Sequence, residues 1–293
     1  GFLGNIELIE TFCKKNNITL IEDFTESFSA NKIIDGKSLY AGMFGDVSIC
    51  RINDTYFYAT DDEKLAEYLL FLNNINVDGI IVQDLGVIYL AKKIVPHLPL
   101  HASTQMAVHN KEGALALKKL GFQRVVLARE LSLKEITEIA SIPDLETEAF
   151  IHGALCYAYS GLCLFSSMAT GRSANRGKCA YPCRALFQGM NKKAHFFSMK
   201  DMALQEDILK LPVTSLKIEG RKKKALYVAA VVDYYRQILD TGHADPQKAN
   251  NIKQIFSRPW TTFHVLGKNS DIIDPDFVGH RGLTIGQVDC VIQ

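Results

Sequence analysis

The sequence predicts an α/β protein organised as a TIM-like (βα)-barrel. Between residues 76 and 240, short apolar segments rich in β-branched residues alternate with segments of helical period. The first apolar segments begin about 21 to 26 residues apart, which is the spacing of consecutive βα units. They are almost continuously apolar, as expected of parallel strands covered by helices on both faces. No glycine-rich phosphate motif follows any of them, so a dinucleotide-binding sheet is disfavoured.

The elements can be placed in order along this repeat. The expected strands cover residues 77–82, 98–102, 124–128, 148–151, 196–198 and 214–219. The expected helices cover residues 85–95, 110–120 and 224–239, with two more beginning near Ser132 and Asp201. Ser132 and Glu135 have the spacing of a capping box, which fixes the start of one helix. Before residue 55 the pattern is less regular, with a strand expected at 18–21 and a strand or hairpin within 46–60.

Polar side chains gather directly after the strands, where a barrel places its active site. The candidate catalytic residues at these strand ends are His101, Arg129, Glu130, Lys217, Glu219 and Arg221. Arginine and lysine in this position can bind the carboxylates of an anionic substrate. Two structural alternatives remain open. Arg129–Glu130 and Glu219–Arg221 can be ion pairs at the barrel rim, and His101 can be a hydrogen-bonded core histidine.

A basic segment without acidic residues interrupts the barrel pattern. From Ala149 to Met199 the chain has six Lys or Arg residues and no Asp or Glu. Such a one-sided charge pattern favours the binding of an anion. The alternative is a solvated basic loop with no partner.

Four of the seven cysteines, Cys156, Cys163, Cys179 and Cys183, lie in the same segment. An odd total argues against a secreted disulfide framework. The first gap is unusual for a zinc finger or ribbon, whereas loops that wrap an iron–sulfur cluster tolerate irregular spacing. The spacing therefore favours a cluster over zinc, and it leaves ordinary buried or free thiols open.

The composition is that of a globular protein, with 47% hydrophobic and 22% charged residues and a net charge of +1. No apolar run approaches the roughly 20 residues of a membrane span, and the chain does not open on a signal peptide. We therefore expect a cytoplasmic protein with no membrane partner. The missing initiator Met and the apolar C-terminal end predict that the sequence is a fragment of a longer protein.

Three regions are predicted along the chain. Residues 1–55 are a divergent N-terminal part of the barrel, which is expected to be incomplete there. Residues 56–240 are the barrel core, with a Cys-rich segment at 152–184. Residues 241–293 are a C-terminal extension that starts a small β domain.

Two long motifs surround the cysteines: EAFIHGALCYAYSGLCLFS at residues 148–166 and GRSANRGKCAYPCR at residues 171–184. Shorter motifs lie at residues 101–106, 126–130, 198–201 and 215–221. In combination they resemble peptidase family U32, the collagenase-like protease family. Phe165 stands where a smaller aliphatic residue is expected, and the family's Gly- and Ala-rich opening unit is not found in residues 1–54. Residues 256–262 and 280–286 resemble the start of the family's small β domain.

The resemblance implies an oxygen-independent hydroxylase. Several family members are similar to enzymes that bind a 4Fe–4S cluster and hydroxylate a tRNA wobble uridine, a ribosomal RNA cytidine or a quinone precursor. The RNA-acting members are considered to use prephenate as the oxygen donor. By position, the four cysteines would be the cluster ligands. We therefore expect hydroxylation of a tRNA base, with Arg172, Arg176, Lys178 and Arg184 binding RNA phosphates.

Two other functions remain open. A collagenase-like peptidase needs a nucleophile with a base, or a metal with an open position. No His-Glu-x-x-His motif occurs, and Ser103 and Ser160 lack the strained elbow of serine hydrolases. A non-catalytic partner subunit would form a hetero-oligomer with a larger family member. Tyr157 and Tyr159 are expected to be buried packing residues in preference to stacking on a base.

Overall fold

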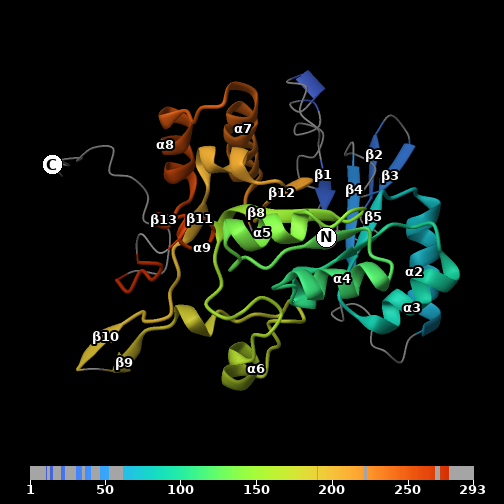
Figure 1. Cartoon of the computed structure of the whole chain (residues 1–293), viewed down its shortest axis with the longest axis horizontal. Coiled ribbons are helices and arrows are strands. Elements are labelled where there is room, and N and C mark those ends of the chain that lie inside the picture. The colour runs from blue at the N-terminus through green and yellow to red at the C-terminus, as the bar shows by residue number, and fades with distance from the viewer. Residues whose placement is uncertain are drawn as a thin grey trace, which may run out of the picture. The chain divides into compact units, whose positions relative to one another are not determined.

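The strand–helix repeat folds into a mixed α/β structure with a mostly parallel sheet (Figure 1). The computed structural model describes residues 11, 14, 15, 21–23, 31–34, 37–40, 47–52, 62–189, 191–220, 223–267 and 271–276. Expectations for Arg221, for most of residues 1–55 and for residues 277–293 lie outside the described residues.

The chain divides into two compact units. The first comprises Gly1–Phe150, Ala158–Pro182 and Leu211–Lys217. The second comprises Ile151–Tyr157, Cys183–Lys210 and Ile218–Gln293. One boundary between them falls inside a strand of the sheet, so each unit is described by itself.

The first unit is built on parallel strands that pair in the order β1-β4-β5-β6-β7-β8. These are β1 (Ile21–Asp23), β4 (Val47–Ile52), β5 (Gly79–Val82), β6 (Leu100–Ala102), β7 (Arg124–Val126) and β8 (Glu146–Ala154). The strand β12 (Ser215–Ile218) also pairs with β8. Every residue of β5 and β6 is buried, as parallel strands covered on both faces require. The strands expected at 77–82, 98–102, 124–128, 148–151 and 214–219 are confirmed.

Three helices of the first unit, those starting at Leu85, Lys111 and Leu133, begin where the sequence predicts, whereas the helices at 62–74 and 165–170 were not predicted. The helical elements of this unit are α2 (Asp62–Asn74), α3 (Leu85–Ile94), α4 (Lys111–Lys119), α5 (Leu133–Ala140), the short α6 (Phe165–Thr170) and the 3-10 turn η2 (Thr104–Met106). Asp84 caps α3 and Asn110 caps α4 through side-chain oxygens that accept backbone N–H groups. The capping box of Ser132 and Glu135 opens α5. The strands β2 (Asn31–Ile34) and β3 (Lys37–Tyr40) form an antiparallel pair.

The second unit continues β8 with an antiparallel neighbour. The end of β8 pairs with β11 (Asp201–Ala203), and β11 pairs in parallel with β13 (Trp260–Thr261). Its other elements are β9 (Phe187–Gly189), β10 (Lys192–Ala194), η4 (Gln205–Lys210), α7 (Ala225–Thr241), α8 (Pro246–Ile255) and α9 (Phe263–Leu266). The helix α7 confirms the one expected at 224–239. Within the described part of the chain, no helix has the length and apolar character needed to cross a bilayer.

The strand expected at residues 196–198 and the helix expected from Asp201 are wrong. Residues 201–203 form β11 instead, and all three are buried. The carboxylate of Asp201 accepts a hydrogen bond from Arg258, which lies 57 positions away in the sequence. Phe197 packs its ring edge-to-face against two other aromatic rings and is not part of a strand. The apolar pair at 196–197 therefore serves a ring cluster, which the sequence pattern cannot distinguish from a strand.

The described strand pairings do not close a barrel. The strand β11 runs antiparallel to β8, whereas every strand of a (βα)8 barrel is parallel to its neighbours. The TIM-like barrel expected from the sequence is thus not confirmed for the described residues, whose pairing order stays open from β1 to β13. Each unit has its own core, with Leu69 and Leu72 fully buried in the first and Tyr234 and Ile238 in the second.

Candidate functional site

The first unit buries a carboxylate at the centre of a charged network. Glu148, on β8, is only 4% exposed. It accepts hydrogen bonds from Lys217 Nζ of β12 and from Ser215 Oγ, the latter at 2.9 Å, and Arg124 Nη1 of β7 lies 3.5 Å away. Arg124 also pairs with Glu146 at 2.6 Å. Burial opposes ionisation of Glu148, but Lys217, Ser215 and Arg124 together hold its pKa below the ordinary value, so it is a carboxylate.

His101, on β6, is buried close to this network. His101 is only 6% exposed. Its ring lies against Gly79 of the neighbouring strand, where an added Cβ would come within 2.8 Å of His101 Cε1. Burial and the charge of Arg124 lower the pKa of His101 to about 4, so the ring is neutral at physiological pH. Its Nδ1 has no hydrogen-bond partner among the described residues. The structure therefore places His101 in the core, without the hydrogen bond at Nδ1 that a structural histidine usually makes.

Two of the predicted catalytic cations share the ring of Phe150. Arg129 Cζ lies 3.8 Å from the ring centroid, and Lys217 Nζ lies 5.6 Å from it. Such cation–π contacts hold the charged groups over the ring face. Arg129 follows β7 and Lys217 lies near the end of β12, so both positive charges stand at the carboxyl ends of strands. This pair is a candidate site for an anionic group.

Glu130 fastens the Cys-rich segment to the strand ends. Its carboxylate accepts hydrogen bonds from Ser160 N at 2.7 Å and Ser160 Oγ at 2.9 Å, and His109 Nε2 lies 2.9 Å from it. The next residue, Gly161, has a φ of +79°, and a Cβ there would stand 2.6 Å from Gln105 O. Only glycine permits both this conformation and this approach. The chain around Ser160 is therefore held closely against the ends of β6 and β7.

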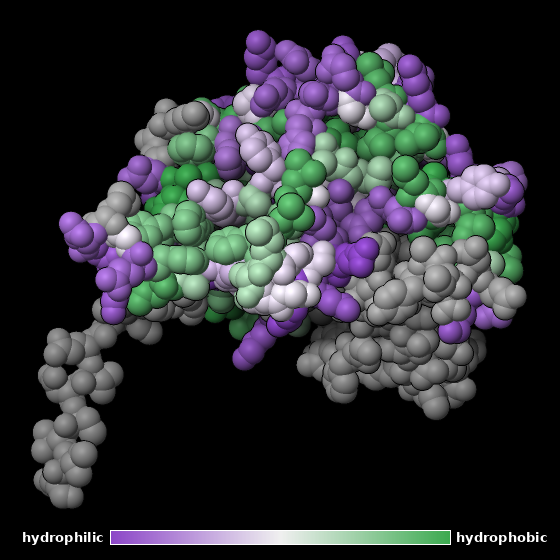
Figure 2. All heavy atoms as spheres, turned by 90° about the horizontal axis from the view of Figure 1, so that it is seen from below, coloured by the Kyte–Doolittle hydropathy of each residue, from purple (hydrophilic) through white to green (hydrophobic). Residues whose placement is uncertain are grey.

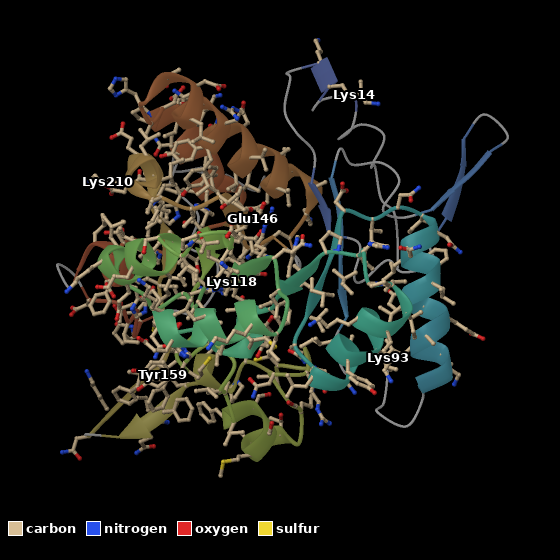
Figure 3. The ribbon with its side chains drawn as sticks, turned by 45° about the vertical axis from the view of Figure 1, so that its right-hand side comes forward. Lys14, Lys93, Lys118, Glu146, Tyr159 and Lys210 are labelled. Atoms are coloured by element: carbon tan, nitrogen blue, oxygen red, sulfur yellow. The ribbon has the colours of Figure 1, made fainter. Side chains whose placement is uncertain are left out.

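The first-unit part of the Cys-rich segment combines cations with exposed rings. Arg172, Arg176 and Lys178 are all exposed. Tyr159 (Figure 3) is 67% exposed, and Tyr181 is 49% exposed. Further exposed apolar residues are Leu162, Leu164 and Met168. Hydrophilic and hydrophobic side chains lie interleaved on the molecular face that Figure 2 shows.

The expectation that Tyr157 and Tyr159 are buried is wrong. Tyr157 is 50% exposed, and Tyr159 is more exposed still. Tyr157 meets Phe197 edge-to-face, and Tyr159 meets His109 in the same way. Edge contacts of this kind leave much of each ring in solvent. Both rings are therefore available for stacking on a partner.

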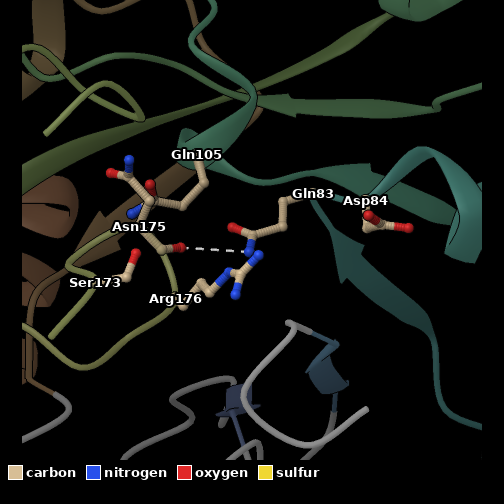
Figure 4. A pocket seen from close by; sticks show the side chains of 6 residues that line it. All are labelled: Gln83, Asp84, Gln105, Ser173, Asn175 and Arg176. Atoms are coloured by element: carbon tan, nitrogen blue, oxygen red, sulfur yellow. Dashed lines mark hydrogen bonds between the residues drawn. The ribbon is translucent and has the colours of Figure 1, made fainter. Parts of the chain in front are cut away.

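A polar pocket of about 280 Å³ opens in the first unit (Figure 4). Its walls come from the ends of β5 and β6 and from the Cys-rich segment. The lining residues are Gln83, Asp84, Gln105, Ser173, Asn175 and Arg176. Gln83 Nε2 donates to Asn175 O at 3.3 Å, and Asn175 Oδ1 accepts from Cys163 N at 3.2 Å. The pocket is thus tied directly to one of the four cysteines.

The second unit holds a separate buried cluster. Asp201, on β11, pairs with Arg258 at 3.1 Å. His152 Nδ1, on β8, is hydrogen-bonded to Tyr235 OH at 3.1 Å, and burial lowers the pKa of His152 to about 4. Burial also lowers the pKa of the nearby Lys223 to about 8, against the attraction of Asp201.

Arg184, a predicted RNA contact, is partly buried in the second unit. It donates to Ser198 Oγ at 2.8 Å and to two main-chain carbonyl oxygens. Its charge also interacts with the thiols of Cys156 and Cys183. The structure thus gives its guanidinium several internal partners, unlike the exposed cations at 172, 176 and 178.

In the described part of the chain, none of the four predicted metal ligands is in a disulfide. Cys163 and Cys179 belong to the first unit, and Cys156 and Cys183 belong to the second. Tyr181 N donates to Cys179 Sγ at 3.3 Å. Among the described residues, no three Cys, His, Asp or Glu side chains are gathered as metal ligands. By their chemistry, four thiols are suitable ligands for an iron–sulfur cluster or for zinc.

The predicted catalytic residues divide between the two units. His101, Arg129, Glu130 and Lys217 lie in the first unit, Glu219 lies in the second, and Arg221 is outside the described residues. Glu219 stands against Gly153, where a Cβ would come within 2.5 Å of Glu219 Cβ. Sequence reasoning missed Glu148, although an acid inside an apolar strand was a usable signal. It also missed Asn175, which lies in an irregular loop without any such signal.

Known proteins resemble this chain along most of its length. The model of Peptidase family U32 matches residues 27–274. A tRNA hydroxylation protein of Bacillus subtilis is 38% identical over 238 residues, which cover 76% of this chain and 56% of that protein. A tRNA hydroxylation protein of Helicobacter pylori is 35% identical, covering 87% of this chain and 64% of that protein. A 23S rRNA 5-hydroxycytidine synthase of Escherichia coli is 35% identical, covering 85% and 41%. The chain therefore spans less than two thirds of the length of these relatives.

Proposed function

The chain belongs to peptidase family U32, and we propose that it is an enzyme that hydroxylates a base of RNA, with tRNA as the favoured substrate. The names of its relatives support this proposal. The observation that carries it is the surface of the Cys-rich segment. There, three exposed cations accompany exposed tyrosine rings in a stretch without acidic residues. Phosphates need the cations and unpaired bases need the rings, so this surface suits RNA.

We propose Arg172, Arg176 and Lys178 as the phosphate contacts, and Tyr159 and Tyr181 as stacking platforms. All five side chains are exposed and belong to the first unit. Arg184 contributes less to RNA binding in this proposal, because its guanidinium already bonds internal oxygens.

The cofactor in this proposal is a 4Fe–4S cluster held by Cys156, Cys163, Cys179 and Cys183. Four clustered cysteines outside any disulfide, the N–H donor to Cys179 Sγ and the surrounding positive charge support it. When bound, such a cluster would supply one-electron redox chemistry, which protein side chains lack. Zinc is the alternative metal for the same thiols.

The oxygen donor in this proposal is prephenate, a dianion. Arg129 and Lys217 stand over the ring of Phe150 at the strand ends and offer two positive charges to its carboxylates. Glu148 fixes the ammonium of Lys217, and the neutral His101 stands close to both. The protein groups thus bind and orient an anion next to an imidazole that can hold or accept a proton.

The arrangement around Ser160 argues against the peptidase alternative. A serine peptidase needs its base bonded directly to the nucleophilic hydroxyl. Here Ser160 Oγ donates to one carboxylate oxygen of Glu130, and His109 Nε2 bonds the other. The carboxylate of Glu130 therefore lies between the hydroxyl and the imidazole, so the histidine does not bond the serine directly. This arrangement holds the loop in place and does not activate a nucleophile. An odd number of cysteines, four of them clustered, also agrees with a reducing compartment, so we propose a cytoplasmic location.

The proposed partner besides RNA is a second, larger family member in a hetero-oligomer. The exposed apolar residues Leu162, Leu164 and Met168 support a protein contact. Size measurement of the chain mixed with such a protein tests this point.

The function is tested by nucleoside mass spectrometry on tRNA from cells with and without the gene. The expected result is a base that carries one additional oxygen atom only when the gene is present. A point variant, Cys163→Ser, should abolish the product and lower iron and acid-labile sulfide from about four per chain in anaerobic preparations. Zinc in place of iron, or unchanged tRNA, would overturn the redox proposal.

The RNA surface is tested by the salt dependence of tRNA binding. Replacing Arg172, Arg176 and Lys178 by Ala should reduce the slope of log Kd against log salt by about 2 to 3, because three phosphate contacts are lost. The control variant replaces the exposed Lys111, Lys119 and Lys134 by Ala, with the same loss of net charge. Equal slopes in the two triple variants would move the RNA site away from the Cys-rich segment.

A further inference from the structure

Arg184 lies directly after Cys183, and its side chain reaches the segment of a second cysteine. In the second unit, Arg184 Nη2 donates to the main-chain oxygen of Leu155 at 3.2 Å. Leu155 immediately precedes Cys156, and 29 positions separate it from Arg184 in the sequence. One side chain therefore joins the backbone beside Cys156 to the backbone beside Cys183.

The guanidinium of Arg184 is also held on its other side. Its Nη1 donates to Ser198 Oγ at 2.8 Å and to the main-chain oxygen of Met199. Ser198 and Met199 are both buried, so these acceptors belong to the core of the second unit. The backbone of Arg184 is held as well, because its carbonyl oxygen is hydrogen-bonded to His195 Nδ1 at 3.1 Å. A planar guanidinium fixes the directions of such bonds, which an ammonium on a flexible stem does not.

The positive charge of Arg184 is bonded only to neutral oxygens among the described residues, one hydroxyl and two carbonyls. Asp201 attracts it, but the carboxylate of Asp201 is already bonded to Arg258 at 3.1 Å, and Arg258 repels Arg184. A partly buried cation is costly unless an anion accompanies it. The other groups that attract Arg184 are Cys183 and Cys156, once they are thiolates.

We propose that Arg184 is a positioning residue for the metal centre, which holds the segments of Cys156 and Cys183 together and stabilises the negative charge of their metal-bound thiolates. The assignment rests on the proposed function, and it moves Arg184 from the predicted RNA contacts to the cofactor. A 4Fe–4S centre with thiolate ligands gains one negative charge when an external donor gives it one electron. A fixed cation beside the ligands therefore favours the reduced form and raises the reduction potential.

Two substitutions separate the bonds of Arg184 from its charge. Arg184→Lys keeps the charge and replaces the planar fork by a single ammonium, so the bridge to Leu155 and Ser198 is lost. Arg184→Gln keeps N–H donors and removes the charge. Lys193→Gln is the matched control, because Lys193 is exposed on β10 of the same unit and the substitution removes the same charge.

The first measurement is the midpoint potential of the anaerobically prepared protein, titrated with dithionite as the electron donor and followed by electron paramagnetic resonance. In Arg184→Gln the equilibrium constant for reduction should fall about tenfold, because one partly buried charge is lost. That fall corresponds to about 59 mV for one electron. In Arg184→Lys and in Lys193→Gln the constant should stay within about threefold of the wild-type value, since the first keeps its charge and the second loses a charge that water and salt screen.

The second measurement is the rate at which a chelator removes iron from the same proteins. Both Arg184 variants should lose iron about tenfold faster than the wild type, because groups that orient metal ligands contribute about that factor or more to metal affinity. Lys193→Gln should lose iron at the wild-type rate. Thermal unfolding of each variant separates a misfolded protein from a changed metal centre.

Two results would each overturn the role of Arg184. The first is a wild-type potential in Arg184→Gln, since an arginine that only supports the fold would leave the potential unchanged. The second is wild-type iron retention in Arg184→Lys, since the bridge between the two segments would then be irrelevant to the metal. Either result leaves the proposed function standing, because the wild type still holds its cluster. No iron and no acid-labile sulfide in the anaerobic wild type would overturn the proposed cofactor together with this assignment.

Discussion

Both units pair a buried acid with a partly buried cation close to a buried histidine, but the two histidines are held differently. In the first unit the residues are Glu148, Lys217 and His101, and in the second they are Asp201, Arg258 and His152. His152 Nδ1 is hydrogen-bonded to Tyr235 OH, and aromatic rings surround the imidazole. His101 Nδ1 has no such partner among the described residues, and charged groups surround its ring.

This difference separates a structural group from a candidate functional one. A buried histidine that is hydrogen-bonded and packed among rings is explained by the fold alone. A buried histidine that lacks a partner beside a carboxylate and two cations is not explained in that way, and such groups concentrate at functional sites. The comparison therefore favours the strand ends of the first unit as the place where substrate is bound.

Removing Lys217 should break the first cluster most severely. In Lys217→Ala the buried Glu148 keeps only Ser215 and the more distant Arg124, so the free energy of unfolding should fall by about 3 kcal/mol. Urea unfolding at neutral pH measures the loss. Lys210→Ala is the control, because its pair with Asp207 is exposed and should contribute less than about 1 kcal/mol. Similar losses in the two variants would mean that Glu148 is not an uncompensated charge when Lys217 is absent.

The two histidines should make stability depend on pH. Burial lowers the pKa of each from 6.5 to about 4. Between those values the unfolded chain binds protons that the folded chain does not, so stability rises with pH and is fully present above about 6.5. Each histidine should contribute a slope of about 1.4 kcal/mol per pH unit inside this window.

Urea unfolding of the wild type, His101→Leu and His152→Phe across that window tests the slopes. Each single variant should lose the share of one histidine. A slope that is unchanged in His101→Leu would show that this ring is protonated in the folded protein. That result would remove the contrast between the two units on which the site assignment depends.

A smaller loss should follow removal of the hydroxyl that bonds His152. Tyr235 OH bonds His152 Nδ1 at 3.1 Å and donates to Ile151 O at 3.2 Å. Tyr235→Phe leaves these buried groups short of a partner, so the free energy of unfolding should fall by about 1 to 2 kcal/mol. The exposed Tyr89 provides the control, and Tyr89→Phe should change stability by less than about 0.5 kcal/mol in the same measurement. If Tyr235→Phe left the free energy of unfolding unchanged, the hydrogen bond from Tyr235 would not explain the burial of His152. The contrast between His152 and His101 would then be lost.

The sequence predicts the local part of this structure and misses the long-range part. The strands β5 to β8 could be placed because a buried parallel strand is a continuous apolar run, and α5 because its capping box lies within four residues. The strand β11 could not be placed, because the burial of Asp201 depends on Arg258, far away along the chain. The hydrophobic pattern of a single segment also does not indicate whether β11 runs parallel or antiparallel to β8.

The candidate site shows the same division. Arg129 and Glu130 could be selected because both follow a recognisable strand, and His101 and Lys217 because each is a polar residue within one. Their partners could not be assigned, since Lys217 bonds an acid 69 positions away. The exposure of Tyr159 was also unpredictable, because loop residues have no period from which burial can be read.

The smallest effect should come from a third acid, Glu130, which follows β7. Its carboxylate is partly exposed and bonds Ser160 and His109, so Glu130→Gln should change the free energy of unfolding by less than about 1 kcal/mol. Locally, the amide that replaces one oxygen donates where an acceptor is needed. Hydrogen exchange at residues 158–164 should therefore become faster, while exchange in α4 and α5 stays unchanged.

Glu138→Gln, an exposed substitution on α5, should alter neither quantity. Faster exchange would establish Glu130 as the anchor of the Cys-rich segment, distinct from the buried acids of both units. Unchanged exchange would show that these hydrogen bonds do not hold the loop, and Glu130 would then return to the group of catalytic candidates.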